Sequence, residues 1–121
     1  NTTYEAIRIS SGNSFVHETE SQVILNGSRD INFTMDLVSK DIGIFHEIAR
    51  RAGLELELAP LLVDIFKDGE ARYGSREFSP NIIKRLEEPL GIEVRAPGFP
   101  AEMVDDEPEV PGFEVVVGRT A

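Results

Sequence analysis

One amphipathic stretch, Asn32–Gly53, constrains the fold of this chain more than any other feature. Its apolar residues recur at spacings of three and four, so that two rows share one broad helical face. The rows are Val38, Ile42, Phe45, Ala49 and Ala52, and Leu37, Ile44 and Ile48. Arg50 and Arg51 fall in the last turn, where cations favour the negative end of the helix dipole, and Gly53 supplies a left-handed stop. The stretch predicts a helix that packs through one side, with Thr34 or Asn32 as its cap.

Four other segments show helical spacing of their apolar residues. They are Thr2–Ser11 with a threonine cap, Ser14–Leu25, Ala59–Tyr73, and a last helix that starts with Ser79-Pro80 and closes at Pro89 and Gly91. We expect their inward positions to be Phe15, Val16, Thr19, Val23, Ile24, Leu61, Leu62, Ile65, Phe66, Ile82, Ile83 and Leu86. Leu54–Leu58 alternates as a strand does, but the run is short and Pro60 opens the next helix, so no strand is expected there.

The composition excludes several classes of partner. The 121 residues suffice for one domain, and the net charge is −10. So acidic a chain will not hold a nucleic-acid backbone or an anionic membrane. Cysteine is absent, so redox chemistry does not constrain the compartment and the cytoplasm is the default expectation. The chain begins Asn1-Thr2-Thr3 without an initiator methionine, which indicates a piece of something longer.

The character of the sequence changes after Pro89. Five of the seven prolines lie in the last 33 residues, interspersed with acidic side chains. We therefore divide the chain into a helical domain, residues 1–90, and an acidic, proline-rich extension, residues 91–121, that lies over the domain surface or a partner. Phe113–Val117 could form a short β-strand if an edge is available to receive it.

The common cofactor and metal motifs are missing. No Gly-x-Gly-x-x-Gly follows a strand, and there is no Walker loop. His46-Glu47 resembles the start of a zinc-binding helix motif, but position 50 is Arg, so the ligand pair is broken and no metal is expected. We expect His46 to lie on the helix surface beside Phe45.

One local group of residues suits a ligand. Phe33 precedes Lys40 by about two helical turns, so both can look toward the same side, with Asp41 next to the lysine. An ammonium beside an aromatic ring can hold an anionic or aromatic ligand. In the alternative interpretation Phe33 is a hydrophobic staple and Lys40 pairs with Asp36 on the helix surface.

Several of these residues together resemble a known domain. They are the run Ser10-Ser11-Gly12-Asn13-Ser14-Phe15, then Asn32-Phe33, Asp36-Leu37-x-x-Lys40-Asp41-x-Gly43, Ala52-Gly53 and Glu77-x-Ser79. The pattern resembles the C-terminal helical domain of the β-hydroxyacid dehydrogenases, which is similar to the C-terminal domain of 6-phosphogluconate dehydrogenase. That family includes 3-hydroxyisobutyrate dehydrogenase and tartronate semialdehyde reductase. The resemblance covers about Tyr4–Leu86 and implies a compact, all-α, multi-helix domain. The irregular acidic tail after Pro89 has no counterpart in that family.

The resemblance also implies a function. Family members transfer a hydride between NAD or NADP and a small hydroxy acid or semialdehyde, and their helical domain mediates dimerisation. Phe33, Lys40 and Asp41 would contact the cofactor, and Ser11, Asn13 and Ser14 would border the substrate. Lys40, Lys67 and Lys84 all lack the family's Gly-x-x-x-x-Lys-x-x-Asn-Asn context. The catalytic lysine and the Rossmann domain that binds most of the cofactor would therefore lie upstream, and this chain alone would be inactive.

Two other interpretations stay open. In one, the chain is a non-enzymatic helical association module, in which the same apolar rows dimerise and Lys40 is a surface residue. In the other, it belongs to a divergent dehydrogenase, such as an imine reductase relative, that reduces a different polar double bond.

Overall fold

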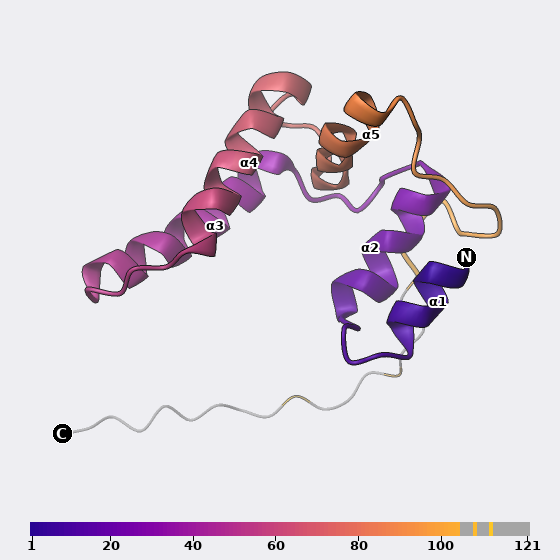
Figure 1. The fold of residues 1–121 in the computed structure, drawn as a ribbon, viewed down its shortest axis with the longest axis horizontal. Coiled ribbons are helices and arrows are strands. Elements are labelled where there is room, and N and C mark those ends of the chain that lie inside the picture. The colour runs from indigo at the N-terminus through magenta and orange to yellow at the C-terminus, as the bar shows by residue number, and fades with distance from the viewer. Residues whose placement is uncertain (105–107, 109–111, 113–121) are drawn as a thin grey trace.

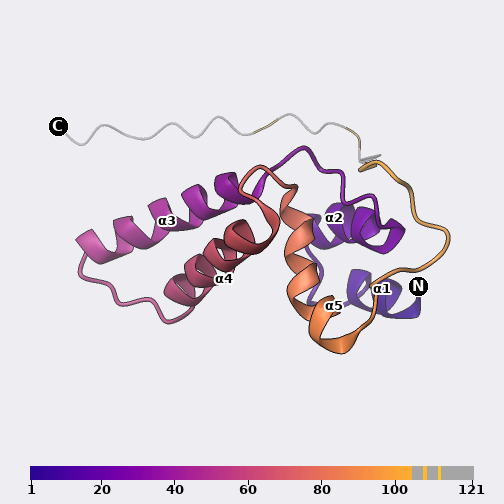
Figure 2. The same ribbon diagram turned by 90° about the horizontal axis from the view of Figure 1, so that it is seen from above.

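The computed structural model describes residues 1–104, 108 and 112. Its helices are, in chain order, α1 (Thr2–Arg8), α2 (Phe15–Asn26), α3 (Met35–Arg51), α4 (Leu58–Tyr73), the 3-10 helix η1 (Ser79–Ile83) and α5 (Lys84–Leu90). The pair α1–α2 lies at one end, the pair α3–α4 at the other, and α5 lies between them (Figures 1 and 2). Within the described residues β-pairing is limited to two isolated bridges, so the all-α prediction is confirmed.

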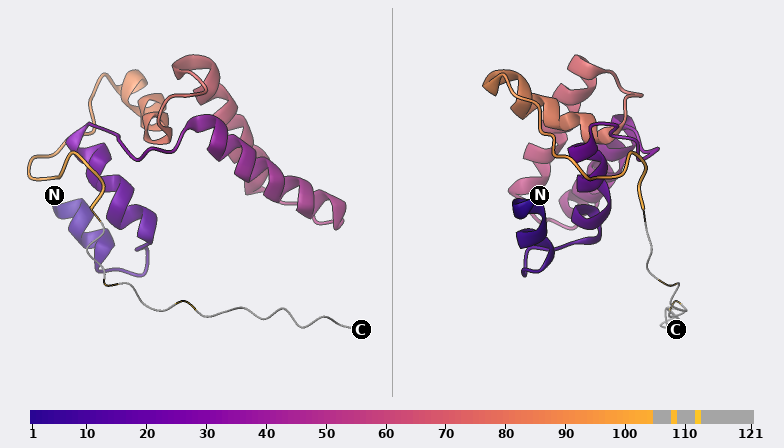
Figure 3. Two further views of the ribbon diagram at one scale, coloured as in Figure 1. Left: turned by 180° about the vertical axis from the view of Figure 1, so that it is seen from behind. Right: turned by 90° about the vertical axis from the view of Figure 1, so that its right-hand side faces the viewer.

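Helices α3 and α4 form the most extensive helix pair, seen from behind in Figure 3. Their contact buries small residues, Ala49 on α3 and Ala59 and Gly69 on α4, together with the fully buried Met35 at the start of α3. A Cβ added to Gly69 would lie 2.5 Å from Ile82 Cδ1 and 3.1 Å from Met35 Sδ. The missing side chain therefore lets α4 approach both α3 and η1 closely.

The buried face of α3 is narrower than the sequence predicts. The expectation was wrong for several residues placed inward, whose side chains are exposed: Phe15, Val16, Ile44, Phe45, Ile48, Ala52, Leu61, Leu62 and Leu86. A single neighbouring helix covers only part of a broad apolar face, and α3 packs chiefly on α4. The outer apolar row of α3, formed by Ile44, Phe45 and Ile48, therefore remains exposed.

The helix ends agree with the sequence in some places and differ in others. Thr34 is the N-cap residue of α3, and Gly53 follows the helix with a φ of 72°. Asn1, and not a threonine, precedes α1, which ends at Arg8, before the predicted Ser11. Residues 54–58, whose apolar side chains alternate, form no strand, as expected, and α4 begins at Leu58.

The last predicted helix is two elements. Ser79 is the first residue of η1 and not a cap, Phe78 precedes it, and α5 starts at Lys84. Pro89 lies inside α5, and the helix stops at Gly91 with a φ of 61°. A proline in the last turn removes only one backbone bond of a short helix, so it does not end α5 where it stands.

The described part of the predicted extension lies along α2. The Ala96 amide donates to the Leu25 carbonyl at 2.9 Å, and Asn26 Nδ2 donates to the Phe99 carbonyl at 2.8 Å. The ring of Phe99 meets the buried Tyr4 edge-on, with 5.0 Å between centroids. The strand predicted at 113–117 lies outside the described residues. None of the helices in residues 1–104 has the length and apolar character that crossing a bilayer requires.

Candidate functional site

Backbone hydrogen bonds hold Phe33 at the start of α3. Its carbonyl accepts from the Ser79 amide at 2.8 Å, and the Met35 amide donates to the Glu77 carbonyl at 3.0 Å. Thr34 and Phe78 form the antiparallel bridge between these two segments. The half-buried Phe33 is therefore placed by the segment that leads into η1, which is distant in sequence.

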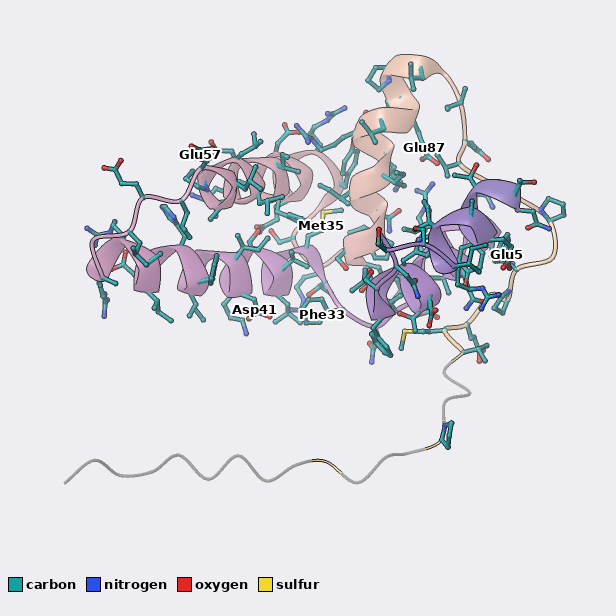
Figure 4. All side chains as sticks on the ribbon, turned by 60° about the horizontal axis from the view of Figure 1, so that its bottom comes forward. Glu5, Phe33, Met35, Asp41, Glu57 and Glu87 are labelled. Carbon is teal, nitrogen blue, oxygen red and sulfur yellow. The ribbon has the colours of Figure 1, made fainter. Side chains whose placement is uncertain are left out.

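Lys40 and Asp41 form an ion pair on the exposed side of α3. Lys40 Nζ lies 2.9 Å from Asp41 Oδ1, with the side chains 58% and 55% exposed. Figure 4 shows Phe33 and Asp41 on the same side of the chain, away from α4. An ion pair this exposed contributes at most about 1 kcal/mol to stability. Lys40 is therefore available to another anion.

Asp36 has partners other than Lys40, so the surface pair in the alternative interpretation is wrong. The Thr34 hydroxyl donates to Asp36 Oδ1, and Arg76 donates to Asp36 Oδ2 at 3.0 Å. The Thr34 hydrogen bond, followed by that of Arg76, lowers the pKa of Asp36 below its ordinary value. Asp36 thus anchors the first turn of α3 and leaves Lys40 to Asp41.

A shallow groove of about 390 Å³ runs along α3 next to this pair. Its lining includes Lys40, Gly43, Ile44, Glu47, Ile48 and Arg51. A Cβ added to Gly43 would meet nothing within 4 Å, so the centre of the groove is open. Hydrogen bonds from Arg50 and then Arg51 lower the pKa of Glu47 to about 2, so this carboxylate is charged at neutral pH. The groove offers an apolar floor with charged groups at its sides.

The second predicted set, Ser11, Asn13 and Ser14, lies in the turn between α1 and α2. Ser14 caps α2 by accepting from the His17 amide at 3.0 Å, and Asn13 Nδ2 donates to Glu18 at 2.6 Å. This turn is at the end of α2 away from the connector to α3 (Figure 1). A helix of that length is about 18 Å long, so the structure does not bring the two predicted sets together.

A buried polar cluster joins the connector between α2 and α3 to η1 and α5. Arg29 Nη2 donates to both oxygens of Glu87, at 2.9 and 2.7 Å, and Nη1 donates to Asn81 Oδ1 at 3.0 Å. Burial raises the pKa of Glu87, but the Val94 amide, the Arg29 hydrogen bonds and nearby positive charge outweigh it and lower the pKa below its ordinary value. Sequence reasoning missed this cluster because its members are 52 and 58 residues from Arg29 and follow no spacing rule.

His46 also differs from expectation. It is half-buried, and its Nδ1 is buried with no hydrogen-bond partner among the described residues, whereas Phe45 beside it is exposed. The prediction of a surface histidine was wrong because 46 lies four residues from Ile42 and three from Ala49, on the row that meets α4. No group of three metal-ligating side chains occurs among the described residues.

Comparison with known proteins gives one family and two relatives. The family model described as the NAD-binding domain of NADP-dependent 3-hydroxyisobutyrate dehydrogenase matches residues 1–86. The chain is 32% identical over 94 residues to 2-(hydroxymethyl)glutarate dehydrogenase of Eubacterium barkeri, covering 77% of this chain and 31% of that protein. It is 30% identical over 83 residues to an uncharacterized oxidoreductase of Shewanella frigidimarina (strain NCIMB 400), covering 69% and 28%. No solved structure matches.

Proposed function

We propose that this chain, which belongs to the family of the NAD-binding domain of NADP-dependent 3-hydroxyisobutyrate dehydrogenase, is part of a larger enzyme. In this proposal it forms the helical C-terminal domain of an NAD(P)-dependent 3-hydroxyacid dehydrogenase or semialdehyde reductase. The family and its NAD(P) cofactor are those that the sequence predicted. The chain spans about a third or less of the length of its relatives. The activity, substrate and partners of the whole protein are therefore part of the proposal.

The exposed Lys40–Asp41 pair on α3, with the half-buried Phe33 on the same side of the chain, is the observation that carries this proposal. A bound nicotinamide dinucleotide supplies or accepts the hydride. Its flat rings and anionic groups suit an aromatic wall, an open groove without a Cβ at Gly43, and an exposed ammonium. We assign Phe33 to the wall beside the cofactor ring, Lys40 to an anionic group of cofactor or substrate, and Asp41 to orienting the lysine.

Ser11, Asn13 and Ser14 are kept as proposed substrate-side residues. A small hydroxy acid cannot touch both this turn and Lys40 in the arrangement described, because the length of α2 separates them. The α3 set therefore supports the proposal, and the turn residues depend on how the rest of the enzyme closes over α2.

The exposed apolar side chains support a role inside a larger assembly. Five apolar side chains are buried in the described residues, while a greater number of large ones are exposed, including Phe45, Ile48 and Leu58. Surfaces of this kind mark sites of contact with other parts of a protein. We propose that they meet the Rossmann domain and a second subunit, and that the isolated chain is inactive.

Substitution of Lys40 in the full-length enzyme tests the proposal. Lys40→Ala should lower kcat/KM for hydride transfer by more than about tenfold, a barrier change above about 1.4 kcal/mol. The matched control is Lys67→Ala, an exposed lysine on α4, which should leave the rate within about twofold. Equal rates for both variants would refute the assignment of Lys40.

A non-enzymatic association module remains the second candidate, and the exposed outer row of α3 favours it. The two candidates differ in the reading frame upstream of Asn1. A Gly-x-Gly-x-x-Gly and a Gly-x-x-x-x-Lys-x-x-Asn-Asn there would support the dehydrogenase, and an open frame lacking both would support the module. The cytoplasmic location and the dimer stay predictions.

A further inference from the structure

The buried cluster around Arg29 joins three parts of the chain. Arg29 lies in the connector between α2 and α3, Asn81 in η1, and Glu87 in α5. The side chains of Arg29 and Glu87 are 9% and 7% exposed, and Glu87 also accepts from the Val94 amide at 2.7 Å. Nη1 of Arg29 donates to Asn81 and Nη2 to both oxygens of Glu87, so the planar guanidinium meets partners on two elements at once, which fixes its orientation as well as its distance.

The backbone of Arg29 shows that its position is over-determined. Its φ is 58°, in the left-handed region that residues other than glycine rarely adopt. Its amide donates to the Val23 carbonyl at 3.1 Å, which ties it to the last turn of α2. A strained residue persists only where the surroundings hold it, and here its side-chain partners do so.

The same cluster reaches the segment that holds Phe33. Asn81 Nδ2 donates to Glu77 Oε1 at 3.1 Å and to the Phe78 carbonyl at 3.2 Å. Residues 77–79 are the ones whose backbone pairs with Phe33–Met35. The connector is therefore fastened to this segment twice, through the Arg29 side chain at one end and the Phe33 backbone at the other.

We propose that Arg29 is a positioning residue that acts through Asn81 and Glu87 to fix Phe33 at the cofactor wall. This inference rests on the proposed function, since it assigns Arg29 a part in placing that wall. Arg29 itself touches neither cofactor nor substrate. Its effect is on the distance between the ring of Phe33 and the cofactor, to which hydride transfer is sensitive.

A role in positioning differs from a role in stability, and the chemistry of buried pairs separates the two. Replacing a buried ion pair by apolar side chains of similar size is often neutral for stability, whereas the hydrogen-bonded geometry is lost. The informative variant is therefore the double substitution Arg29→Met/Glu87→Leu. Arg29→Lys is the conservative partner, because it keeps the charge and loses the fork.

The experiment compares these variants with Glu88→Gln in the full-length enzyme. Glu88 is the exposed neighbour of Glu87 on α5, paired with Arg72, so it serves as a matched control. For both test variants, kcat per folded site should fall at least about tenfold, with the dissociation constant of NAD(P)H changing less than about threefold. Amide hydrogen exchange at Met35 and Ser79 should quicken by at least about tenfold, with the control unchanged.

The outcomes separate this inference from the function on which it rests. The inference is overturned if the folded test variants keep both kcat and amide exchange near the values of Glu88→Gln. It is also overturned if amide exchange becomes faster without a loss of kcat, while Phe33→Ala lowers kcat. If Phe33→Ala leaves kcat unchanged, the proposed function fails. The exchange rates at Met35 and Ser79 then decide by themselves whether Arg29 positions this segment.

Discussion

The α3–α4 pair and the Arg29 cluster are held together by opposite means. The helix pair is joined by small and apolar side chains, with Met35, Ala49 and Ala59 buried and Gly69 at the closest approach. The cluster is buried and is joined by charge and by the hydrogen bonds of Arg29 to Asn81 and Glu87. Apolar contact is tolerant of direction, whereas hydrogen bonds from one planar guanidinium to Asn81 and Glu87 restrict its orientation.

This difference indicates that the two regions have different structural roles. The helix pair presents a long exposed face, and the cluster includes Arg29 of the connector that leads into α3. Substitutions in the two regions should therefore change the free energy of unfolding by different amounts, with different pH dependence and in different directions.

The largest effect is expected in the cluster. Arg29→Met should lower the free energy of unfolding by about 3–5 kcal/mol, because Glu87 is left buried and unpaired. The double variant with Glu87→Leu should regain most of that loss. Urea unfolding followed by circular dichroism measures both, and a single variant as stable as the double one would mean that the junction tolerates an unpaired carboxylate.

The loss in Arg29→Met should depend on pH. The pKa of Glu87 is below its ordinary value in the folded protein, despite burial, because the Val94 amide and Arg29 favour its charged form. Its contribution to stability is therefore complete above the unfolded pKa of about 4.3 and is lost as the pH falls through the lower folded value. The gap in unfolding free energy between wild type and Arg29→Met should narrow below about pH 4. A gap that is constant from pH 7 to pH 3 would contradict this.

Two mid-helix glycines test the packing of the helix pair. Gly69→Ala places a Cβ against Ile82 and Met35 and should cost about 1–3 kcal/mol by overpacking, partly offset by helix propensity. Gly43→Ala, on the open side of α3, should stabilise the fold by about 0.5–1 kcal/mol. Thermal unfolding of both variants decides the point, and stabilisation by Gly69→Ala would show that α4 and η1 are not as close as described.

Substitutions of the two histidines should change stability in opposite directions, each by a small amount. His46→Leu removes a buried nitrogen that has no partner among the described residues, so it should stabilise the fold by about 1 kcal/mol. His17 is hydrogen-bonded through both nitrogens, to the Tyr4 carbonyl at 3.0 Å and to Ser21 at 3.3 Å. His17→Leu should therefore destabilise by about 1 kcal/mol. Stabilisation by both substitutions would indicate that burial, and not hydrogen bonding, dominates at these sites.

The helices could be predicted because their signals are local. The period of the apolar residues in α3, the glycine stops at Gly53, Gly74 and Gly91, and Pro80 at the start of η1 each act within a turn or two. The candidate site was predicted as residue types on α3, with Lys40 and Asp41 adjacent in sequence. The width of the buried face could not be predicted, because it depends on how many neighbours a helix has, and the spacing of Ile44, Phe45 and Ile48 does not report that.

The sequence by itself determined where the chain is helical and that an aromatic ring, an ammonium and a carboxylate accompany α3. Only the tertiary structure decided that Asp36 pairs with Arg76 from 40 residues away, that one ring nitrogen of His46 is buried, and that Arg29 meets Glu87 from 58 residues away. The physical reason is range: helix periodicity and capping act between residues a few positions apart, whereas burial and ion pairing depend on which distant segments the fold brings into contact.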